Sequence, residues 1–222
     1  SQIPLGQIRS DGRDNIISSL LIAASGQVHE VCIYFNGVLL RGNRSTKRSS
    51  DQFEAFESPN DAPLAHAGIQ IEYKKRVLRP ASEEAFRFQP FKELPIGVIK
   101  IFPGIQFDYF ASLMTDKLKG VVLETFGAGN IPGSAQNALL PIIERAYQNG
   151  TIITVCSQCS QGAVSLGTYA ASSALRRVGA VNGRDMTTEA ALAKSYYLMS
   201  ISDDMAFVKS QMQKSLRGEL TE

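Results

Sequence analysis

The sequence predicts an α/β protein built around a parallel sheet, and three observations support this class. Downstream of residue 97, short apolar runs alternate with segments of helical apolar spacing. Connections long enough to hold a helix join parallel strands and cover both faces of the sheet. The chain has 222 residues, of which 44% are hydrophobic and 20% charged, so it can form one large domain or two small ones with a genuine core. This composition also excludes a disordered chain.

A polar stretch between Lys74 and Pro95 divides the chain into two parts. It contains three prolines and many charged residues, and it shows no apolar period, which is typical of a linker. We therefore expect a first domain segment at residues 1–75, a linker at residues 76–96 and a second, α/β domain at residues 97–222.

The sequence of the first segment predicts one helix, one hairpin and one isolated strand. The helix is expected to have one apolar face and to end at Ser25-Gly26. The runs at residues 28–35 and 38–41 flank Asn36-Gly37, a pair that tolerates the positive φ angles of a type I′ hairpin turn. A further strand is expected at residues 67–73. These elements alone do not make a complete domain. The apolar face of the helix consists of Ile16, Ile17, Leu20, Leu21 and Ala24.

The sequence of the second domain predicts three strands that alternate with helices. Thr187 supplies a hydroxyl that can cap the N-terminus of one helix, and Arg217-Gly218 ends the last helix. The strands are expected at residues 98–102, 121–123 and 152–155, and the helices at residues 107–114, 139–146, 187–199 and 205–216.

Charge and cysteine content restrict the partners of the chain. The 23 lysine and arginine residues against 21 aspartate and glutamate residues give a net charge of +2, which is too small for a nucleic-acid footprint. No apolar run approaches the roughly 18 to 20 residues that a bilayer span requires. Three cysteines in a chain of this length argue against a disulfide framework and fit a reducing compartment. We therefore expect no nucleic-acid partner, no membrane partner and a cytoplasmic location.

The loop at residues 124–132 follows a predicted strand and contains the sequence Phe126-Gly127-Ala128-Gly129-Asn130. Loops at the carboxyl ends of parallel strands commonly bind ligands through free backbone N–H groups. This loop lacks the third glycine of a dinucleotide fingerprint, so nucleotide binding is disfavoured. Two interpretations stay open: a tight strand-to-helix turn, and a polar clamp that holds a substrate with Asn130.

A Cys-x-x-Cys sequence at Cys156 and Cys159 follows the next predicted strand. Such a pair occurs in redox proteins and in zinc sites. Zinc would need two further ligands, and His29, His66 and Cys32 show no ligand spacing. We therefore expect a buried Cys156, a Cys159 that lines a loop, no metal site, and no catalytic role for either histidine.

Four cationic residues gather at residues 41–48, in the sequence Arg-Gly-Asn-Arg-Ser-Thr-Lys-Arg. Such a charge run is usually a solvated loop. Alternatively, one lysine turns inward to pair with a carboxylate and forms part of a proton relay beside a hydroxyl nucleophile. Composition does not decide between these two interpretations.

Several strings along the chain occur in the order typical of one enzyme family. They are Ser1-Gln2-Ile3-Pro4-Leu5, Arg9-Ser10-Asp11-Gly12, the run from Arg41 to Lys47, Phe56-Glu57-Ser58-Pro59-Asn60, Tyr169-Ala170, Asp185-Met186-Thr187 and the run from Leu216 to Thr221. With these strings the sequence resembles the type I, cytoplasmic L-asparaginases over nearly its whole length. The resemblance implies the rear part of an N-terminal catalytic domain, followed by a complete flavodoxin-like C-terminal domain with a parallel sheet.

The resemblance also implies an activity: hydrolysis of L-asparagine to L-aspartate and ammonia through a threonine nucleophile and an acyl-enzyme intermediate, with no metal or organic cofactor. Lys47 matches the lysine of the family's proton relay. Gln2 follows the strand that borders the substrate pocket, so the resemblance implies that Gln2 contacts the substrate. The family forms a homodimer or a dimer of dimers, in which Asn130 would contact the substrate of the neighbouring protomer.

An effector site is a further implication of the resemblance. Three residues match its positions: Glu124, Ser157 and Cys159. Some bacterial members carry an arginine that binds regulatory asparagine at the position of Glu124. With a carboxylate at this position, the chain departs from the pattern of those members.

Two motifs of the family do not occur in this sequence. They are the Thr-Gly-Gly-Thr loop that bears the nucleophile and the Asp-Gly-Thr-Asp-Thr loop that bears the relay threonine and aspartate. The resemblance places both before Ser1, so we expect the nucleophile on a segment absent from this chain, for example a separate N-terminal polypeptide. Two other function classes stay open: a non-catalytic asparagine-binding or assembly fragment, and the ammonia-releasing subunit of an amidotransferase.

Overall fold

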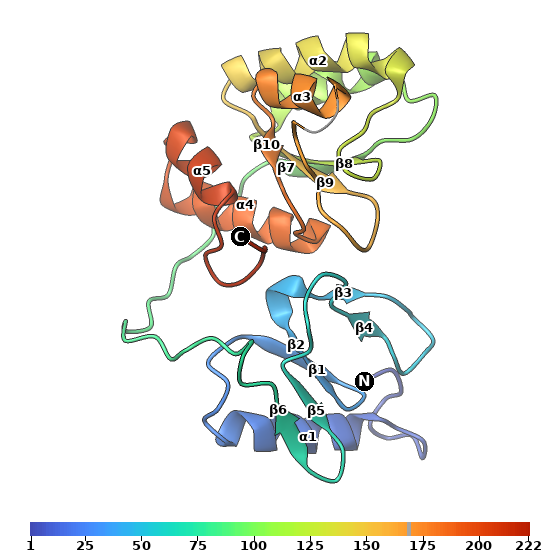
Figure 1. The fold of residues 1–222 in the computed structure, drawn as a ribbon, viewed down its shortest axis with the longest axis vertical. Coiled ribbons are helices and arrows are strands. Elements are labelled where there is room, and N and C mark those ends of the chain that lie inside the picture. The colour runs from blue at the N-terminus through green and yellow to red at the C-terminus, as the bar shows by residue number, and fades with distance from the viewer. Residues whose placement is uncertain (168–169) are drawn as a thin grey trace. The chain divides into compact units, whose positions relative to one another are not determined.

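The structure, a computed structural model, describes residues 1–167 and 170–222, which form two compact units (Figure 1). Unit 1 comprises residues 1–87 and unit 2 comprises residues 88–222. Tyr169, which belongs to one of the strings above, lies outside the described residues. Within the described ranges, no helix is both long enough and apolar enough to cross a membrane.

Unit 1 contains one helix, a four-stranded antiparallel sheet and a two-stranded ribbon. The sheet has the strand order β1-β2-β5-β6, and the ribbon consists of β3 and β4. A 3₁₀ turn at Gly42–Arg44 leads from β2 toward the ribbon. The elements are α1 (Gly12–Ala24), β1 (Cys32–Phe35), β2 (Val38–Arg41), β3 (Thr46–Lys47), β4 (Phe56–Glu57), β5 (Ala65–Ala67) and β6 (Ile71–Tyr73).

The predicted hairpin of unit 1 is confirmed. Strands β1 and β2 pair in antiparallel register, with Phe35 opposite Val38. Between them, Asn36 and Gly37 have φ angles of 49° and 78°, and a type I′ turn requires positive φ at both of these positions. The first strand begins at Cys32 rather than at residue 28.

The prediction of a single strand at residues 67–73 is wrong, because this region belongs to the hairpin of β5 and β6. The turn lies between Ala67 and Ile71, and in it the N–H of Gly68 donates to the carbonyl of Gln70 at 3.0 Å. Ile69, at the tip, is fully exposed. The turn has no Asn-Gly or Asp-Gly pair to mark it in the sequence. Because Ile69 is apolar, the sequence of the turn resembles that of a continuing strand.

Helix α1 is confirmed, but the apolar face that the sequence predicts is not buried. Four side chains of this face are about half exposed or more: Ile16, Ile17, Leu20 and Leu21. The helix contributes Ile22 to the small apolar core of unit 1, which also contains Leu39, Leu64 and Ala65. Within the described residues of unit 1, this apolar face is therefore mostly exposed.

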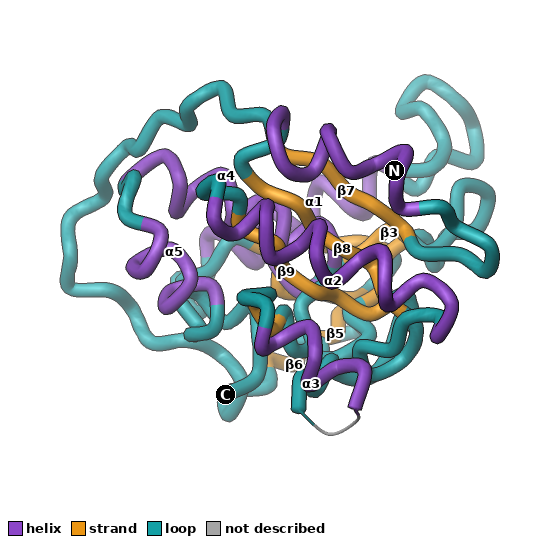
Figure 2. The backbone as a smooth tube through the Cα atoms, turned by 90° about the horizontal axis from the view of Figure 1, so that it is seen from above, coloured by secondary structure: helices purple, strands orange, loops and turns teal. Residues whose placement is uncertain are grey.

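Unit 2 has the predicted parallel sheet. Its strand order is β10-β9-β8-β7, every neighbouring pair is parallel, and β7, β8 and β9 lie side by side (Figure 2). Helices α2 and α3 cover one face, and α4 and α5 cover the other (Figure 1). The elements are β7 (Ile96–Lys100), β8 (Gly120–Thr125), α2 (Gly133–Gln148), β9 (Ile152–Ser157), α3 (Ala170–Arg177), β10 (Val181–Asn182), α4 (Thr188–Ile201) and α5 (Met205–Met212).

Two apolar cores lie on the two faces of this sheet. Strand β8 serves both, because Val121 and Leu123 point into one core and Val122 into the other. The predicted cap of α4 is confirmed, since the Thr187 hydroxyl accepts a hydrogen bond from the N–H of Ala190 at 3.1 Å. The predicted face of α2 is also buried and consists of Leu139, Ile142, Ile143 and Ala146.

The helix expected at residues 107–114 is not a regular α-helix. The backbone forms a 3₁₀ turn at Phe107–Phe110 and a π-helical turn at Leu113–Lys117. Of the apolar face expected here, Phe107 and Met114 are buried, Phe110 is half-buried and Leu113 is exposed. Apolar spacing therefore predicts only some of the side chains that face the core, and it does not fix the hydrogen-bonding pattern of the backbone between them.

Other differences lie in the last third of unit 2. Helix α3 and strand β10 were not predicted, because the helix is rich in alanine, serine and arginine and the strand has two residues. Helix α5 ends at Met212 and does not reach Leu216. There the carboxylate of Glu219 accepts the N–H of Leu216 at 3.0 Å, so the chain turns back and does not continue as a helix.

Candidate functional site

Lys47 and Gln2, two of the predicted site residues, are in contact within unit 1. Lys47 Nζ lies 3.4 Å from Oε1 of Gln2. The same ammonium lies 5.6 Å from the centroid of the Phe56 ring, a distance at which a cation is attracted to the ring face. Lys47 is exposed, so its ammonium is accessible to a second molecule.

Gln2 is held in place by Asp11. The carboxylate of Asp11 accepts the N–H of Gln2 at 3.0 Å and the N–H of Ile3 at 2.9 Å. Burial alone would raise the pKa of Asp11, but the N–H groups of Ile3 and Gln2 outweigh it and lower the pKa. The side-chain amide of Gln2 donates to the carbonyl of Gln52 at 2.8 Å. Sequence reasoning missed this role, because an aspartate directly before a helix normally indicates an N-cap, and Asp11 makes no such capping bond.

Lys47 itself belongs to the ribbon of β3 and β4. It lies opposite Phe56 in the antiparallel register. The Phe56 ring packs against Phe35, the last residue of β1, with 5.3 Å between the ring centroids. This aromatic contact joins the ribbon to the four-stranded sheet of unit 1.

The basic loop at residues 41–48 fits neither interpretation of the sequence as a whole. Arg41 and Arg44 are buried, whereas Lys47 and Arg48 are exposed. The loop is therefore not solvated throughout, and the cations that turn inward are arginines. Sequence spacing does not reveal this, because the partners of the buried arginines come from distant parts of the chain.

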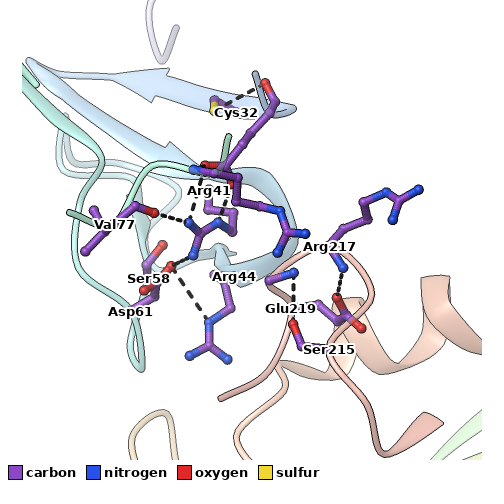
Figure 3. Close-up of polar contacts among 12 residues, drawn as sticks. Cys32, Arg41, Arg44, Ser58, Asp61, Val77, Ser215, Arg217 and Glu219 are labelled. Atoms are coloured by element: carbon purple, nitrogen blue, oxygen red, sulfur yellow. Dashed lines mark hydrogen bonds and ion pairs between the residues drawn. The ribbon is translucent and has the colours of Figure 1, made fainter. Parts of the chain in front are cut away.

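Arg41 joins three separate segments of unit 1 (Figure 3). Its Nε lies 2.5 Å from Glu30 Oε2, its Nη1 lies 2.6 Å from Asp61 Oδ2, and its Nη2 donates to the carbonyl of Val77 at 2.7 Å. Burial alone would lower the pKa of Arg41, but the carboxylates of Glu30 and Asp61 raise it. The guanidinium fork suits such a site, because its donors are fixed in one plane.

Glu124 and Ser157 lie at the carboxyl edge of the parallel sheet in unit 2. Thr125 pairs opposite Ser157, so β8 and β9 end together. Glu124 Oε1 accepts a hydrogen bond from the Thr188 hydroxyl at 2.6 Å, and its Oε2 lies 3.8 Å from Lys100 Nζ. Glu124 is thereby tied to the start of α4 and the end of β7, at the edge where α/β sheets bind ligands.

Asn130 closes the glycine-rich turn after β8 and is exposed. Its N–H donates to the Phe126 carbonyl at 2.8 Å, and its carbonyl accepts the Phe126 N–H at 2.9 Å. Gly127 and Gly129 have φ angles of 47° and 114°, which favour glycine. The backbone thus forms the tight turn of the first interpretation, and the exposed Asn130 side chain leaves the second interpretation open.

Ser157 and Cys159 belong to a loop that Gln158 holds against the sheet. The Gln158 side-chain amide donates to the carbonyls of Ile101 at 2.5 Å and Glu124 at 2.9 Å. The Ser157 hydroxyl accepts the N–H of Cys159 at 3.0 Å. These bonds bring the three predicted effector residues to one end of the sheet.

All three cysteines are free thiols in environments that differ sharply. As expected, Cys156 is buried and Cys159 is exposed. Burial, together with the charge of Glu124, raises the pKa of Cys156 to about 12. Burial, together with the charge of Glu30, raises the pKa of Cys32 to about 11. Across the described ranges, no group of three His, Cys, Asp or Glu residues is arranged to hold a metal ion.

We expect iodoacetamide at pH 8 to modify Cys159 first. A pKa of about 12 leaves Cys156 with a thiolate fraction on the order of 10⁻⁴ at this pH, and the thiolate is the reacting species. Peptide mass analysis over time measures the order of labelling, with the urea-unfolded chain as a control in which all three thiols react. Early labelling of Cys156 in the folded chain would contradict its burial.

Comparison with known proteins places the chain among the asparaginases. The profile of the glutaminase/asparaginase C-terminal domain matches residues 95–212, and the profile of the asparaginase N-terminal domain matches residues 1–79. Parallel α/β architecture in unit 2 and the Lys47–Gln2 contact in unit 1 are consistent with these matches. The chain belongs to the asparaginase family.

Individual relatives agree with this assignment. The chain is 40% identical over 221 residues to L-asparaginase 1 of Escherichia coli, with 100% of this chain and 65% of that protein covered. It is 39% identical over 223 residues to an L-asparaginase of Dirofilaria immitis, covering 100% of this chain and 38% of that protein. The crystal structure of L-asparaginase I from Vibrio cholerae superposes with a TM-score of 0.93 at 41% identity, covering 100% of this chain and 67% of that one. The chain thus spans less than two thirds of the length of the curated relatives it matches.

Proposed function

We propose that this chain is the part of an L-asparaginase that carries the relay lysine. In this proposal, the complete enzyme hydrolyses L-asparagine to L-aspartate and ammonia in the cytoplasm, and Lys47 belongs to its proton relay. The observation that carries the proposal is the contact of 3.4 Å between Lys47 Nζ and Gln2 Oε1. It joins the residue that matches the relay lysine to Gln2, which in the resemblance follows the strand that borders the substrate pocket.

The proposed reaction uses a hydroxyl nucleophile that must lose its proton as it attacks. The threonine oxygen bonds to the side-chain amide carbon of asparagine, and the threonine proton passes to the relay. The C–N bond then breaks, and the nitrogen takes up a proton and leaves as ammonia. Water attacks the acyl ester, releases aspartate and restores the hydroxyl. Lys47 holds or moves the relay proton at Nζ.

The nucleophile is proposed to lie on a polypeptide segment outside this chain. Two features support this: the Thr-Gly-Gly-Thr and Asp-Gly-Thr-Asp-Thr motifs do not occur in the sequence, and the apolar face of α1 is exposed within unit 1. Exposed apolar faces of this kind mark surfaces that other polypeptide covers. A segment that carries both motifs and packs on α1 would complete the catalytic domain.

Unit 2 is proposed to serve a second copy of the chain and an effector. Asn130, exposed at the glycine-rich turn, would contact the substrate of the neighbouring protomer in a homodimer or a dimer of dimers. Glu124, Ser157 and Cys159 would bind an effector at the carboxyl edge of the sheet. Because Glu124 is a carboxylate, it favours the amino group of a bound amino acid over its carboxylate.

Reconstitution tests the proposed activity. The chain is combined with the part of the Escherichia coli relative that it does not cover, and intact-mass analysis first establishes whether the two polypeptides associate. We expect ammonia release from L-asparagine only when both polypeptides are present, with Lys47→Ala as the inactive control. We call this assembly the reconstituted enzyme.

Other outcomes would assign a different function. A stable assembly that binds asparagine and releases no ammonia would identify a non-catalytic binding or assembly fragment. Ammonia release that depends on an added acceptor enzyme would identify an amidotransferase subunit.

A further inference from the structure

Lys47 lies on a ribbon that is too short to hold itself in place. Strands β3 and β4 pair through two residues each, Thr46 with Glu57 and Lys47 with Phe56. Even a complete two-stranded hairpin is marginally stable in water. Contacts outside the ribbon must therefore fix the direction in which Lys47 extends.

A buried charged cluster supplies such contacts at one end of the ribbon. We define the Arg41 cluster as Arg41, Glu30 and Asp61, which are joined by the ion pairs described above. Arg41 ends β2, just before the turn that leads into β3. Asp61 follows β4 along the chain. The Arg41–Asp61 contact of 2.6 Å thus ties the segment that enters the ribbon to the segment that leaves it.

Two further contacts repeat this connection. Arg44 Nη2 donates to the carbonyl of Asn60 at 2.7 Å. The Ser45 hydroxyl donates to the Arg41 carbonyl at 2.7 Å and lies 3.2 Å from the Ser58 hydroxyl. Hydrogen bonds and an ion pair therefore connect residues 41–45 to residues 58–61. All of these contacts lie at the same end of the ribbon.

We propose that Arg41 and Asp61 are positioning residues for Lys47, which act by fixing the base of the β3–β4 ribbon. The inference rests on the proposed function, since it assigns the cluster a role in presenting the relay lysine. A single ammonium in place of the guanidinium cannot reach Glu30, Asp61 and the Val77 carbonyl at once, so the fork of Arg41 is required. Removing it frees the ribbon to change direction while the β1–β2 hairpin keeps its own pairing.

The test compares variants of the whole chain by NMR. The ring of Phe35, on β1, shifts the ring signals of Phe56, the cross-strand partner of Lys47, because the two ring centroids lie 5.3 Å apart. We expect Arg41→Met to abolish this shift and Arg41→Lys to reduce it, with the amide signals of the β1–β2 hairpin retained. Arg48→Met is the matched control. Arg48 is also an arginine of the basic loop, but its side chain is 55% exposed and its contact with Glu57 is 3.8 Å long.

Asp61→Asn decides the case if Arg41→Met does not fold. It keeps the size of the side chain and removes the charge that Arg41 contacts. Loss of the Phe56 shift in Asp61→Asn, with the hairpin signals intact, would support the proposal. A Phe56 shift that persists in Asp61→Asn or Arg41→Met, or one that is lost equally in Arg48→Met, would overturn it.

Kinetics of the reconstituted enzyme provide a second readout. Misplacement of a catalytic group by about 1 Å costs about 100-fold in rate, so we expect Arg41→Met to lower kcat by about that factor with KM unchanged. Arg48→Met should stay within about twofold of the original chain. If no assembly shows asparaginase activity, the proposed function fails, and the NMR shift still decides whether the cluster positions Lys47.

Discussion

Lys47→Ala is expected to lower kcat for asparagine hydrolysis by about 10²- to 10⁴-fold in the reconstituted enzyme, which is the usual contribution of a general acid–base group. The substitution removes the amine that lies 3.4 Å from Gln2 Oε1 and shortens an exposed side chain. It leaves the ribbon pairing and the Arg41 cluster in place. We therefore expect the free energy of unfolding to change by no more than about 0.5 kcal/mol, as for other surface substitutions.

The measurement is a steady-state ammonia assay, accompanied by thermal unfolding of the same samples. Arg48→Ala is the control, because Arg48 is the next residue and carries the same charge, but its side chain is directed to a carboxylate on β4. Partial recovery of Lys47→Ala by an added primary amine would show that the lost group acts through its nitrogen. Near-normal kcat in Lys47→Ala would remove Lys47 from the relay.

The sequence predicted those parts of the fold that local patterns determine. The type I′ turn at Asn36-Gly37 and the cap at Thr187 follow from the chemistry of one or two residues. The parallel sheet of unit 2 follows from strands and helices that alternate with clear apolar periods. In each case the signal lies within a short window of sequence, so no knowledge of distant contacts is needed.

Burial of charge in unit 1 could not be predicted in the same way. Arg41 meets Glu30 from 11 residues before it and Asp61 from 20 residues after it, and nothing in the basic loop itself distinguishes Arg41 from Arg48. Family resemblance identifies Lys47, whereas the spacing of residues in the loop does not. The exposed face of α1 is a related case: amphipathic spacing shows that a helix has an apolar side, and it does not show what covers that side.

Asp11 illustrates why the support of a site is harder to predict than the site itself. Its position before α1 predicts a cap, whereas its carboxylate binds the backbone of Gln2 and Ile3. Whether the Asp11 carboxylate caps the helix or binds these N–H groups depends on where the tertiary fold places residues 2 and 3 relative to the start of α1. A single sequence contains that information only through the tertiary fold.

The largest effect on stability is expected at Lys194, which forms a buried ion pair with Glu219 in unit 2. Lys194 Nζ lies 2.6 Å from Glu219 Oε1, and the two side chains are 4% and 5% exposed. The Glu219 carboxylate also accepts the N–H groups of Leu216 and Arg217, which hold the turn after α5 (Figure 3). Removal of one partner leaves an uncompensated buried charge, which typically costs about 3–5 kcal/mol.

We therefore expect Lys194→Met to lower the free energy of unfolding by about 3–5 kcal/mol at neutral pH. Urea denaturation followed by circular dichroism measures this change. Lys92→Met is the matched control in the same unit: Lys92 Nζ lies 3.2 Å from Asp203, but the two side chains are 47% and 94% exposed. An exposed pair contributes about 0–1 kcal/mol, so the control should change stability little.

Acid should reduce the difference between Lys194→Met and the original chain. Burial alone would raise the pKa of Glu219, but the Lys194 ammonium and the N–H groups of Leu216 and Arg217 outweigh it and hold the pKa below its usual 4.5. A carboxyl group with a lowered pKa in the folded state contributes stability that is present above its unfolded pKa and is lost as pH falls through the folded value. The original chain therefore loses this contribution below about pH 4.5, whereas Lys194→Met has already lost the part that depends on the ammonium. Equal effects of Lys194→Met and Lys92→Met at neutral pH, or a difference that persists unchanged into acid, would show that the pair does not stabilise the turn.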